Sequence, residues 1–239
     1  LQLERKVVLE EISMVEDTPD DIVFDLHNSA LWGDHPYGYS ILGTRSTVAA
    51  LDISSVRGLH ERAFHPAHVV VAAAGSIEHQ RLVDALVAAG WGDLPRRPEP
   101  AGPPAPPTVH VPTQRHVSRD SAQAHIVLGS PTVAHSDVRR HTLILVDTLL
   151  GGGMSSRLFQ RVREELGLAY SVYAFQSFHR DTGMHGVYAG TAPESAEQTL
   201  EAVRAELARI TADGITADEL AMGKQQLKGQ ISLSMESVS

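Results

Sequence analysis

The chain has 239 residues, of which 42% are hydrophobic and none is cysteine, and its formal net charge is −9. This length allows one large domain or two small ones, and the ordinary apolar fraction excludes wholesale disorder. The acidic balance argues against a dedicated nucleic-acid binder. Because cysteine is absent, disulfides, thiol catalysis and thiolate metal sites are excluded, so any metal must be held by His, Asp or Glu.

Both ends of the chain, Leu1 and Ser239, fall inside amphipathic runs without a polar tail. Helix termini usually carry a cap or a stop signal, so we expect the chain to be a piece of a longer polypeptide. The absence of a signal peptide is then uninformative about localisation. Apolar runs stay well below the roughly 18–20 residues that a membrane span needs, and we expect no such span.

Apolar residues recur at helical spacing in several segments of the first part of the chain. The helices that this spacing predicts cover residues 1–17, 19–31, 53–64 and 77–89. Thr18 and Asp52 are the expected N-caps of the second and third helices, and Pro19 suits a first helical turn. The unbroken apolar run of residues 69–74 predicts a short buried strand.

Prolines crowd the middle of the chain, with eight of them between residues 95 and 112. A stretch this rich in proline fits neither a helix nor a central strand and favours extended polyproline II. We interpret it as a stiff linker in preference to an SH3-type ligand. The linker divides the chain into residues 1–94 and residues 113–239.

The second part mixes strand and helix patterns. Strands are predicted over residues 123–128, 169–178 and 184–191, and helices over residues 138–150, 155–165, 194–210 and from 217 onward. A hairpin turn is expected at Asp181-Thr182-Gly183, and Thr216 with Glu219 forms a capping-box pattern. Strands, a hairpin and helices in one chain predict an α+β fold.

The 13 histidines include a pair that imitates a zinc motif. His60 and His65 resemble the two histidines of His-Glu-x-x-His, but they are five residues apart. On a helix this spacing separates them by about 140°, so both rings cannot bind one ion. The other histidines show no ligand spacing, and we interpret all of them as surface or hydrogen-bonded residues.

Two acidic residues near the N-terminus share one face of the first helix. Glu4 and Glu11 are seven residues apart, an offset of about 20° on a helix, whereas Glu10 is rotated away. The pair can have a functional role or form a solvated helix face. Composition alone favours the solvated face.

The second part contains two further patterns with possible chemistry. Gly151-Gly152-Gly153 resembles a phosphate loop but lacks the Gly-Lys-Ser/Thr ending, so a tight connector is the preferred interpretation. Arg163 lies near a helix end and Tyr170 at a strand start, with a glycine turn between them. The two side chains can converge on a carbonyl or carboxylate, or they can form a helix-end ion pair and a core tyrosine.

Several segments together resemble the pitrilysin-type (M16) zinc metallopeptidases, in particular the bacterial group similar to the mitochondrial processing peptidase. They are ERKVVLEEI, HPYGYSILGT, VVVAAAGSI, GGGMSSRLFQRVREELGLAYSV and GITADELAMGKQQLKGQISLSMES. The resemblance covers nearly the whole chain, and its glycine-rich segment is the most specific. It implies two homologous α/β-sandwich units, each an antiparallel-rich sheet with helices packed on it. Residues 1–94 would be the C-terminal half of the first, metal-bearing unit, and residues 113–239 a second unit truncated at its C-terminal end.

The resemblance also implies a site. The family binds zinc through His-x-x-Glu-His and a later glutamate, and Glu11 matches that third ligand. Glu4 matches the acidic residue that supports the metal ligands from behind, and Arg163 and Tyr170 match the pair that holds the substrate backbone. No His-x-x-Glu-His occurs in this chain, so the two histidines and the catalytic glutamate are expected upstream of Leu1.

The expected function is therefore part of a zinc endopeptidase that cleaves peptides or unfolded segments with metal-activated water, and this chain alone is expected to be inactive. The alternatives are a non-catalytic M16-like structural or partner subunit and a module that only binds peptides. Expected partners are peptide substrates and a second subunit, in a homodimer or heterodimer, without nucleic acid. The expected location is the bacterial cytoplasm.

Overall fold

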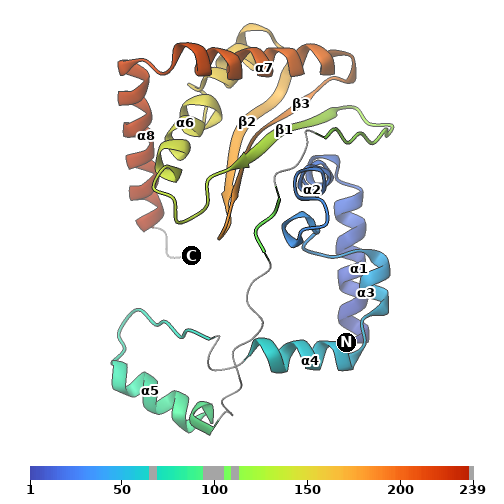
Figure 1. The fold of residues 1–239 in the computed structure, drawn as a ribbon, viewed down its shortest axis with the longest axis vertical. Helices are drawn as coiled ribbons and strands as arrows, with labels where there is room; N and C mark the ends of the chain where they lie inside the picture. The colour runs from blue at the N-terminus through green and yellow to red at the C-terminus, as the bar shows by residue number, and fades with distance from the viewer. Residues whose placement is uncertain (65–68, 94–104, 109–112, 237–239) are drawn as a thin grey trace. The chain divides into compact units, whose positions relative to one another are not determined.

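The computed structural model describes residues 1–64, 69–93, 105–108 and 113–236 (Figure 1). Its contacts divide the chain into two units. Unit 1 comprises Leu1–Ile12 and Leu42–Ala105, and unit 2 comprises Ser13–Ile41 and Pro106–Ser239. This grouping differs from a division at the proline-rich stretch, because residues 13–41 group with the second part. Most of that stretch lies outside the described residues, so the linker and its domain assignment stay predictions.

Unit 1 contains helices but no strand among its described residues. It holds the first part of α1 (Gln2–Glu16), and its other α-helices are α3 (Arg45–Ala50), α4 (Ile53–Ala63) and α5 (His79–Ala88). The predicted cap of α4 is confirmed, because the Asp52 carboxylate accepts a hydrogen bond from the Ser55 backbone N–H at 2.7 Å. Hydrogen bonds from Ser55 and Ser54 lower the pKa of Asp52 to about 2.

The predicted strand over residues 69–74 is wrong, because the structure forms no strand there. Most of its side chains are exposed, including Val70 at 92%. A strand needs a neighbour to satisfy its backbone N–H and C=O groups, and no described segment of unit 1 supplies one. An apolar run indicates a tendency to pair, but the pairing itself depends on a partner.

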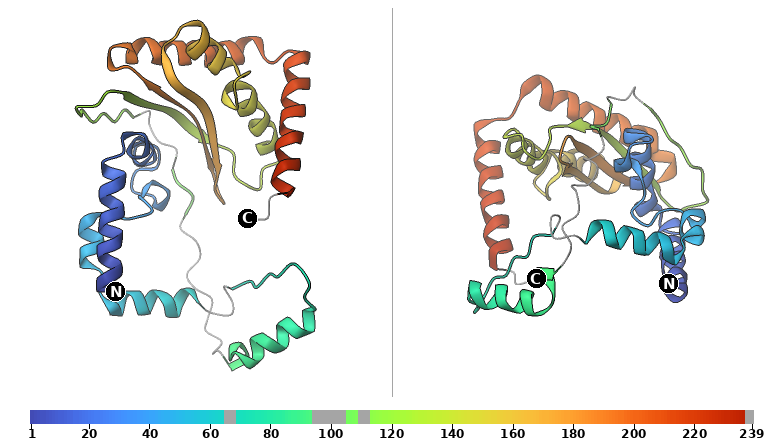
Figure 2. Two further views of the ribbon diagram at one scale, coloured as in Figure 1. Left: turned by 180° about the vertical axis from the view of Figure 1, so that it is seen from behind. Right: turned by 60° about the horizontal axis from the view of Figure 1, so that its bottom comes forward.

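Unit 2 is built on a three-stranded antiparallel sheet in the order β1-β3-β2. Its strands are β1 (Ala124–Thr132), β2 (Ala169–Phe178) and β3 (Gly183–Thr191), and its α-helices are α2 (Pro19–Trp32), α6 (Arg140–Gly151), α7 (Ala196–Asp213) and α8 (Ala217–Glu236). Figures 1 and 2 show α2 and α6 on opposite sides of the sheet. The α+β class and the β2–β3 hairpin are confirmed.

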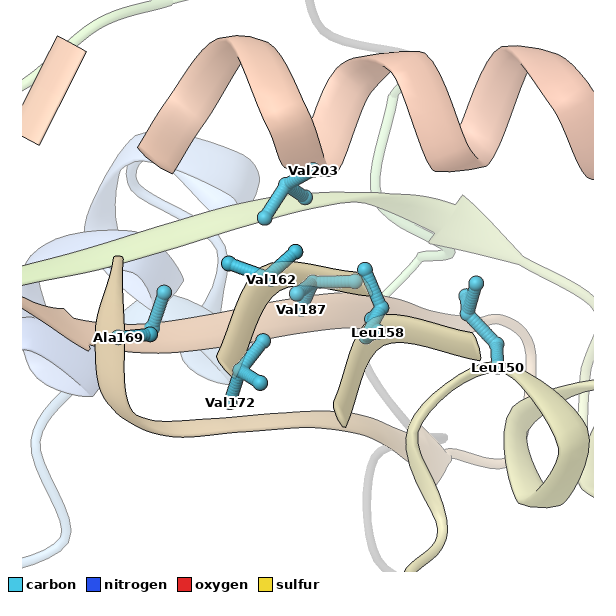
Figure 3. Packing of buried hydrophobic residues seen from close by; sticks show 8 residues of the cluster. Leu150, Leu158, Val162, Ala169, Val172, Val187 and Val203 are labelled. Carbon is cyan, nitrogen blue, oxygen red and sulfur yellow. The ribbon is translucent and has the colours of Figure 1, made fainter. Parts of the chain in front are cut away.

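One face of the sheet carries the aliphatic core of unit 2. Strand residues alternate between the two faces, and on this face Val187 pairs with Leu128 of β1 and with Ala174 of β2. Figure 3 shows Val203 of α7 directed at the cluster. Its buried members are Leu150, Leu158, Val162, Ala169, Val172, Val187, Ala189 and Val203. Each fully buried Val or Leu contributes about 1.5–3 kcal/mol to folding.

The opposite face of the sheet is aromatic and packs against α2. Phe24 of α2 lies edge-on to Phe175 with centroids 5.2 Å apart, and it stacks on Tyr188 at 5.7 Å. The helix begins at Pro19 as predicted, but Thr18 makes no cap bond, because its hydroxyl donates to the Met14 carbonyl at 2.6 Å. This packing places the first turn of α2 beside the sheet.

The predicted capping box at α8 is confirmed. The Thr216 backbone N–H donates to Glu219 Oε2 at 2.8 Å, and the Glu219 N–H donates to Thr216 Oγ1 at 3.2 Å. No helix within the described residues combines the length and the apolar character needed to cross a bilayer.

Candidate functional site

The two candidate metal-site carboxylates lie on α1 in unit 1. Glu4 and Glu11 are both exposed, as the predicted helix face requires, and the next residue, Ile12, is buried. The Arg5 guanidinium donates to the Leu51 carbonyl and so links α1 to the chain before α4.

Within the described residues, no group of three or more His, Asp or Glu side chains is arranged to hold a metal ion. A catalytic zinc site takes three protein ligands and a water. The described residues therefore do not by themselves form a zinc site. That Glu11 supplies one of the three zinc ligands stays a prediction.

Arg163 lies on a seven-residue π-helix, η4 (Phe159–Glu165), where the sequence predicts an ordinary short helix. Its side chain is 45% exposed, and its Nε lies 3.9 Å from Glu164 Oε1, too far for a hydrogen bond. The guanidinium carbon lies 4.8 Å from the centre of the Phe159 ring. Arg163 is thus held at the surface by the Phe159 ring together with a long ion pair to Glu164, so the helix-end ion pair of the alternative interpretation is present as well.

Tyr170 stands at the start of β2, just after a turn that Gly167 makes with a φ of +62°. A β-bulge between Ala169 and Ser171 turns Tyr170 out of the regular pairing, and the side chain is 60% exposed. It is therefore not the core tyrosine of the alternative interpretation. No hydrogen bond or ring contact in the described part of the chain joins it to Arg163, so their convergence on one ligand stays a prediction.

Tyr170 lies at an open hollow of about 350 Å³ between α2 and the aromatic face of the sheet, all within unit 2. We call it the acidic hollow, because two carboxylates from the first turn of α2 line it beside aromatic rings. Its lining residues are Asp20, Asp21, Phe24, Gln123, His125, Tyr170, Ser171, Tyr173 and Tyr188.

The walls of the acidic hollow are ordered by contacts between its aromatic residues. Tyr188 stacks on Tyr173 with centroids 4.9 Å apart, and its hydroxyl shares a hydrogen bond of 2.7 Å with His125 Nδ1. Burial and the nearby Asp20 carboxylate raise the pKa of Tyr188 to about 12. Burial and the charges of Asp20 and Asp21 also raise the pKa of Tyr173.

Burial is the larger cause of both raised tyrosine pKa values, and the carboxylates of Asp20 and Asp21 add a negative potential to the acidic hollow. Such a potential disfavours a second anion and favours a cation, and the faces of aromatic rings attract cations as well. The hollow is therefore suited to a positively charged side chain.

Sequence reasoning did not find the acidic hollow. Asp20 and Asp21 fit the first turn of a helix, and Tyr173 and Tyr188 fit strand patterns. His125 is expected to be a surface or hydrogen-bonded histidine, and its bond to Tyr188 agrees with this, but its place at the hollow is not part of that expectation. The available signal was the hairpin register, because a turn at residues 181–183 sets Tyr173 opposite Tyr188. The docking of α2 against these strands has no local signal.

The chain belongs to the M16 peptidase family, because the family's "Peptidase M16 inactive domain" matches residues 50–227. It is 40% identical to an uncharacterized zinc protease of Streptomyces coelicolor, over 99% of this chain and 52% of that protein. It is also 40% identical to an uncharacterized zinc protease of Bacillus subtilis, over 100% of this chain and 58% of that protein. The chain thus spans about half the length of the relatives that it matches.

Solved structures share the fold. A protease from Helicobacter pylori superimposes with a TM-score of 0.85 at 22% identity, over 99% of this chain and 58% of that one. The peptidase M16 inactive domain from Pseudomonas fluorescens superimposes with a TM-score of 0.82 at 24% identity, over 95% of this chain and 55% of that one. A chain of Complex III2 from Candida albicans superimposes with a TM-score of 0.81 at 20% identity, over 97% of this chain and 56% of that one.

Proposed function

We propose that this chain is part of a zinc-dependent endopeptidase in which it supplies one metal ligand and much of the peptide-binding surface. The observation that carries the proposal is Tyr170, which is exposed at the acidic hollow of unit 2 in a chain whose relatives are named zinc proteases. In the full-length protein Glu11 binds the zinc, Glu4 supports Glu11, and Arg163 and Tyr170 hold the peptide backbone.

The partners and location of the full-length protein are part of the same proposal. Its substrates are peptides or unfolded protein segments, and it pairs with a second M16-like subunit, identical or different. The absence of cysteine agrees with a reducing compartment, and we place the protein in the bacterial cytoplasm.

A non-catalytic partner subunit is the second candidate function. It is favoured by the match to a domain described as inactive. The presence of both Glu4 and Glu11 favours the peptidase, because a subunit without a metal has no evident use for the two carboxylates.

Replacing Glu11 distinguishes the two candidates. In the full-length protein we expect Glu11→Gln to abolish stoichiometric zinc binding and to lower peptidase activity by about 100-fold or more, because a neutral amide is a poor zinc ligand. Glu10→Gln is the matched control, since Glu10 is equally exposed but points away on the same helix. Zinc content by mass spectrometry and the cleavage rate of a fluorogenic peptide are the measurements. Unchanged values in Glu11→Gln contradict the peptidase assignment.

The acidic hollow makes a second test possible, on substrate side chains. We expect Asp21→Asn to lower kcat/KM about ten-fold for a peptide with an arginine, because a charged hydrogen bond is lost. The same peptide with citrulline, which is neutral and of similar shape, is expected to be cleaved equally by both proteins. Glu197→Gln removes an exposed charge from α7 and serves as the control. An equal loss with both peptides contradicts a role of the hollow in binding cations.

A further inference from the structure

Phe159 and Arg163 form a stripe along the π-helix Phe159–Glu165. The guanidinium carbon of Arg163 lies 4.8 Å from the centre of the half-buried Phe159 ring. This distance is inside the roughly 6 Å range over which a guanidinium is attracted to an aromatic face. The contact joins a residue with a proposed substrate role to one that has no role in the proposed function.

The rotation of this helix is fixed by the core. Leu158 precedes Phe159 in the sequence and Val162 precedes Arg163. Leu158 and Val162 are completely buried in the aliphatic cluster (Figure 3). Because Leu158 and Val162 are anchored in the core, the neighbouring stripe of Phe159 and Arg163 lies at the edge of the core. The hydrogen bond from Leu166 N–H to the Arg161 carbonyl, at 3.1 Å, is the wider type that defines a π-helix, and such turns are frequent at functional sites.

The acidic neighbours on the same helix do not take the place of the ring. Glu165 is occupied by Arg161, with an Nη1–Oε2 distance of 2.7 Å. Glu164 forms only a long ion pair with Arg163, because its Oε1 lies 3.9 Å from Arg163 Nε, beyond hydrogen-bond distance. Among the described residues, the Phe159 ring is therefore the best-formed contact of the Arg163 side chain.

Contact through the ring has a chemical consequence for the guanidinium. The Phe159 ring carries no oxygen or nitrogen acceptor, so a guanidinium held over it does not use its five N–H donors in conventional hydrogen bonds. The contact therefore restricts the side chain but leaves its donors available. An ion pair with a carboxylate would use those donors.

We propose that Phe159 is a positioning residue, which holds the guanidinium of Arg163 in place so that the N–H donors stay available for the carbonyl groups of a bound peptide. This inference rests on the proposed function, since it requires Arg163 to bind substrate. Phe159 itself does not touch the peptide.

A double-mutant cycle on kcat/KM in the full-length protease tests the proposal. We expect Phe159→Leu to lower kcat/KM about two- to five-fold, mostly through KM, and Phe159→Tyr, which keeps a ring, to restore the wild-type value. In an Arg163→Ala background, Phe159→Leu is expected to have no further effect. If Phe159→Leu fails to fold, Phe159→Met takes its place in the cycle.

The outcomes separate the two proposals. If Arg163→Ala lowers kcat/KM but Phe159→Leu does not, or if Phe159→Leu lowers it equally with and without Arg163, the positioning role alone is overturned. If Arg163→Ala leaves kcat/KM unchanged, the substrate role of Arg163 is wrong, and the positioning role with it.

Discussion

One ion pair links the chain just before η4 to the last helix of unit 2. Arg157 donates from Nε and Nη2 to the two carboxylate oxygens of Glu219, at 2.7 and 2.9 Å, and also to the Gly214 carbonyl at 2.9 Å. Hydrogen bonds from Arg157 and Thr216 lower the pKa of Glu219 to about 2. Glu219 thus caps α8 and anchors Arg157 at the same time.

The lowered pKa predicts how stability responds to acid. The contribution of Glu219 to folding is fully present above its unfolded pKa of 4.5 and is lost as the pH falls through that value towards 2. We expect Glu219→Gln to cost about 1–3 kcal/mol at pH 7, because both partners are mostly buried, and to flatten the loss of stability between pH 5 and pH 2. Urea unfolding measured across this range checks it.

Glu236→Gln is the control for this prediction, because it removes an exposed carboxylate from the same helix. A Glu219→Gln variant that loses stability in acid as steeply as the wild type would show that this ion pair does not set the acid response.

At the scale of elements, the glycine run joins α6 to η4 by close packing and not by unusual backbone angles. A Cβ on Gly151 would lie 2.1 Å from the backbone nitrogen of Ala174, so α6 can approach β2 only with glycine there. A Cβ on Gly153 would meet only the end of the Gln226 side chain, at 3.3 Å. The segment that suggests a flexible connector therefore contains one position that sets a helix–sheet distance.

Two matched substitutions test this difference. We expect Gly151→Ala to destabilise unit 2 by about 3 kcal/mol, because backbone must move to admit the methyl group. Gly153→Ala is expected to change stability by less than about 0.5 kcal/mol, since Gln226 can shift. Thermal unfolding of both variants is the measurement, and equal effects would contradict the packing explanation.

Most helices and strands could be predicted from the sequence, and their irregularities could not. β2 covers residues 169–178 as expected, because its alternating pattern is bounded by turns, and the Asp52 cap and the Thr216–Glu219 box follow from local chemistry. The π-helix was not expected, since its widened turn depends on how Leu158 and Val162 enter the core. The predicted strand over residues 69–74 does not form, because no neighbouring strand among the described residues pairs with it.

At the scale of the whole molecule, apolar burial is uneven. The core cluster belongs to unit 2, whereas α4 and α5 of unit 1 contain no buried residue. Amide groups in segments with little burial open with a small free energy. The two units are therefore expected to differ in local stability.

Hydrogen exchange measures this difference. In the chain described here, we expect the amides of β2, β3 and α6 to be protected close to the limit set by global unfolding. Those of α4 and α5 should exchange several orders of magnitude faster. Protection of α5 equal to that of α6 would contradict the expectation and would indicate that another surface covers unit 1.

The residues of the candidate site fall into two groups: some are visible in the sequence, and others are brought together only by the fold. Glu4, Glu11, Arg163 and Tyr170 come from family motifs that are visible in the sequence, although their roles remain proposals. The acidic hollow was not visible, because α2 and the β2–β3 hairpin are more than a hundred residues apart in the chain. The pairing of Asp147 of α6 with His185 of β3 was not visible in the sequence either. The buried Asp147 Oδ1 lies 2.7 Å from His185 Nδ1.

The sequence by itself determined the family, the α+β class, the β2–β3 hairpin, the Asp52 cap and the Thr216–Glu219 capping box, because these depend on residue spacing and on hydrogen bonds within a few residues. Only the tertiary structure decided that residues 69–74 stay unpaired, that η4 is a π-helix, and that Asp20 and Asp21 face the tyrosines of the sheet. These features depend on which distant segments pack together. That choice is made by the total apolar area buried and the polar groups satisfied, which no local pattern contains.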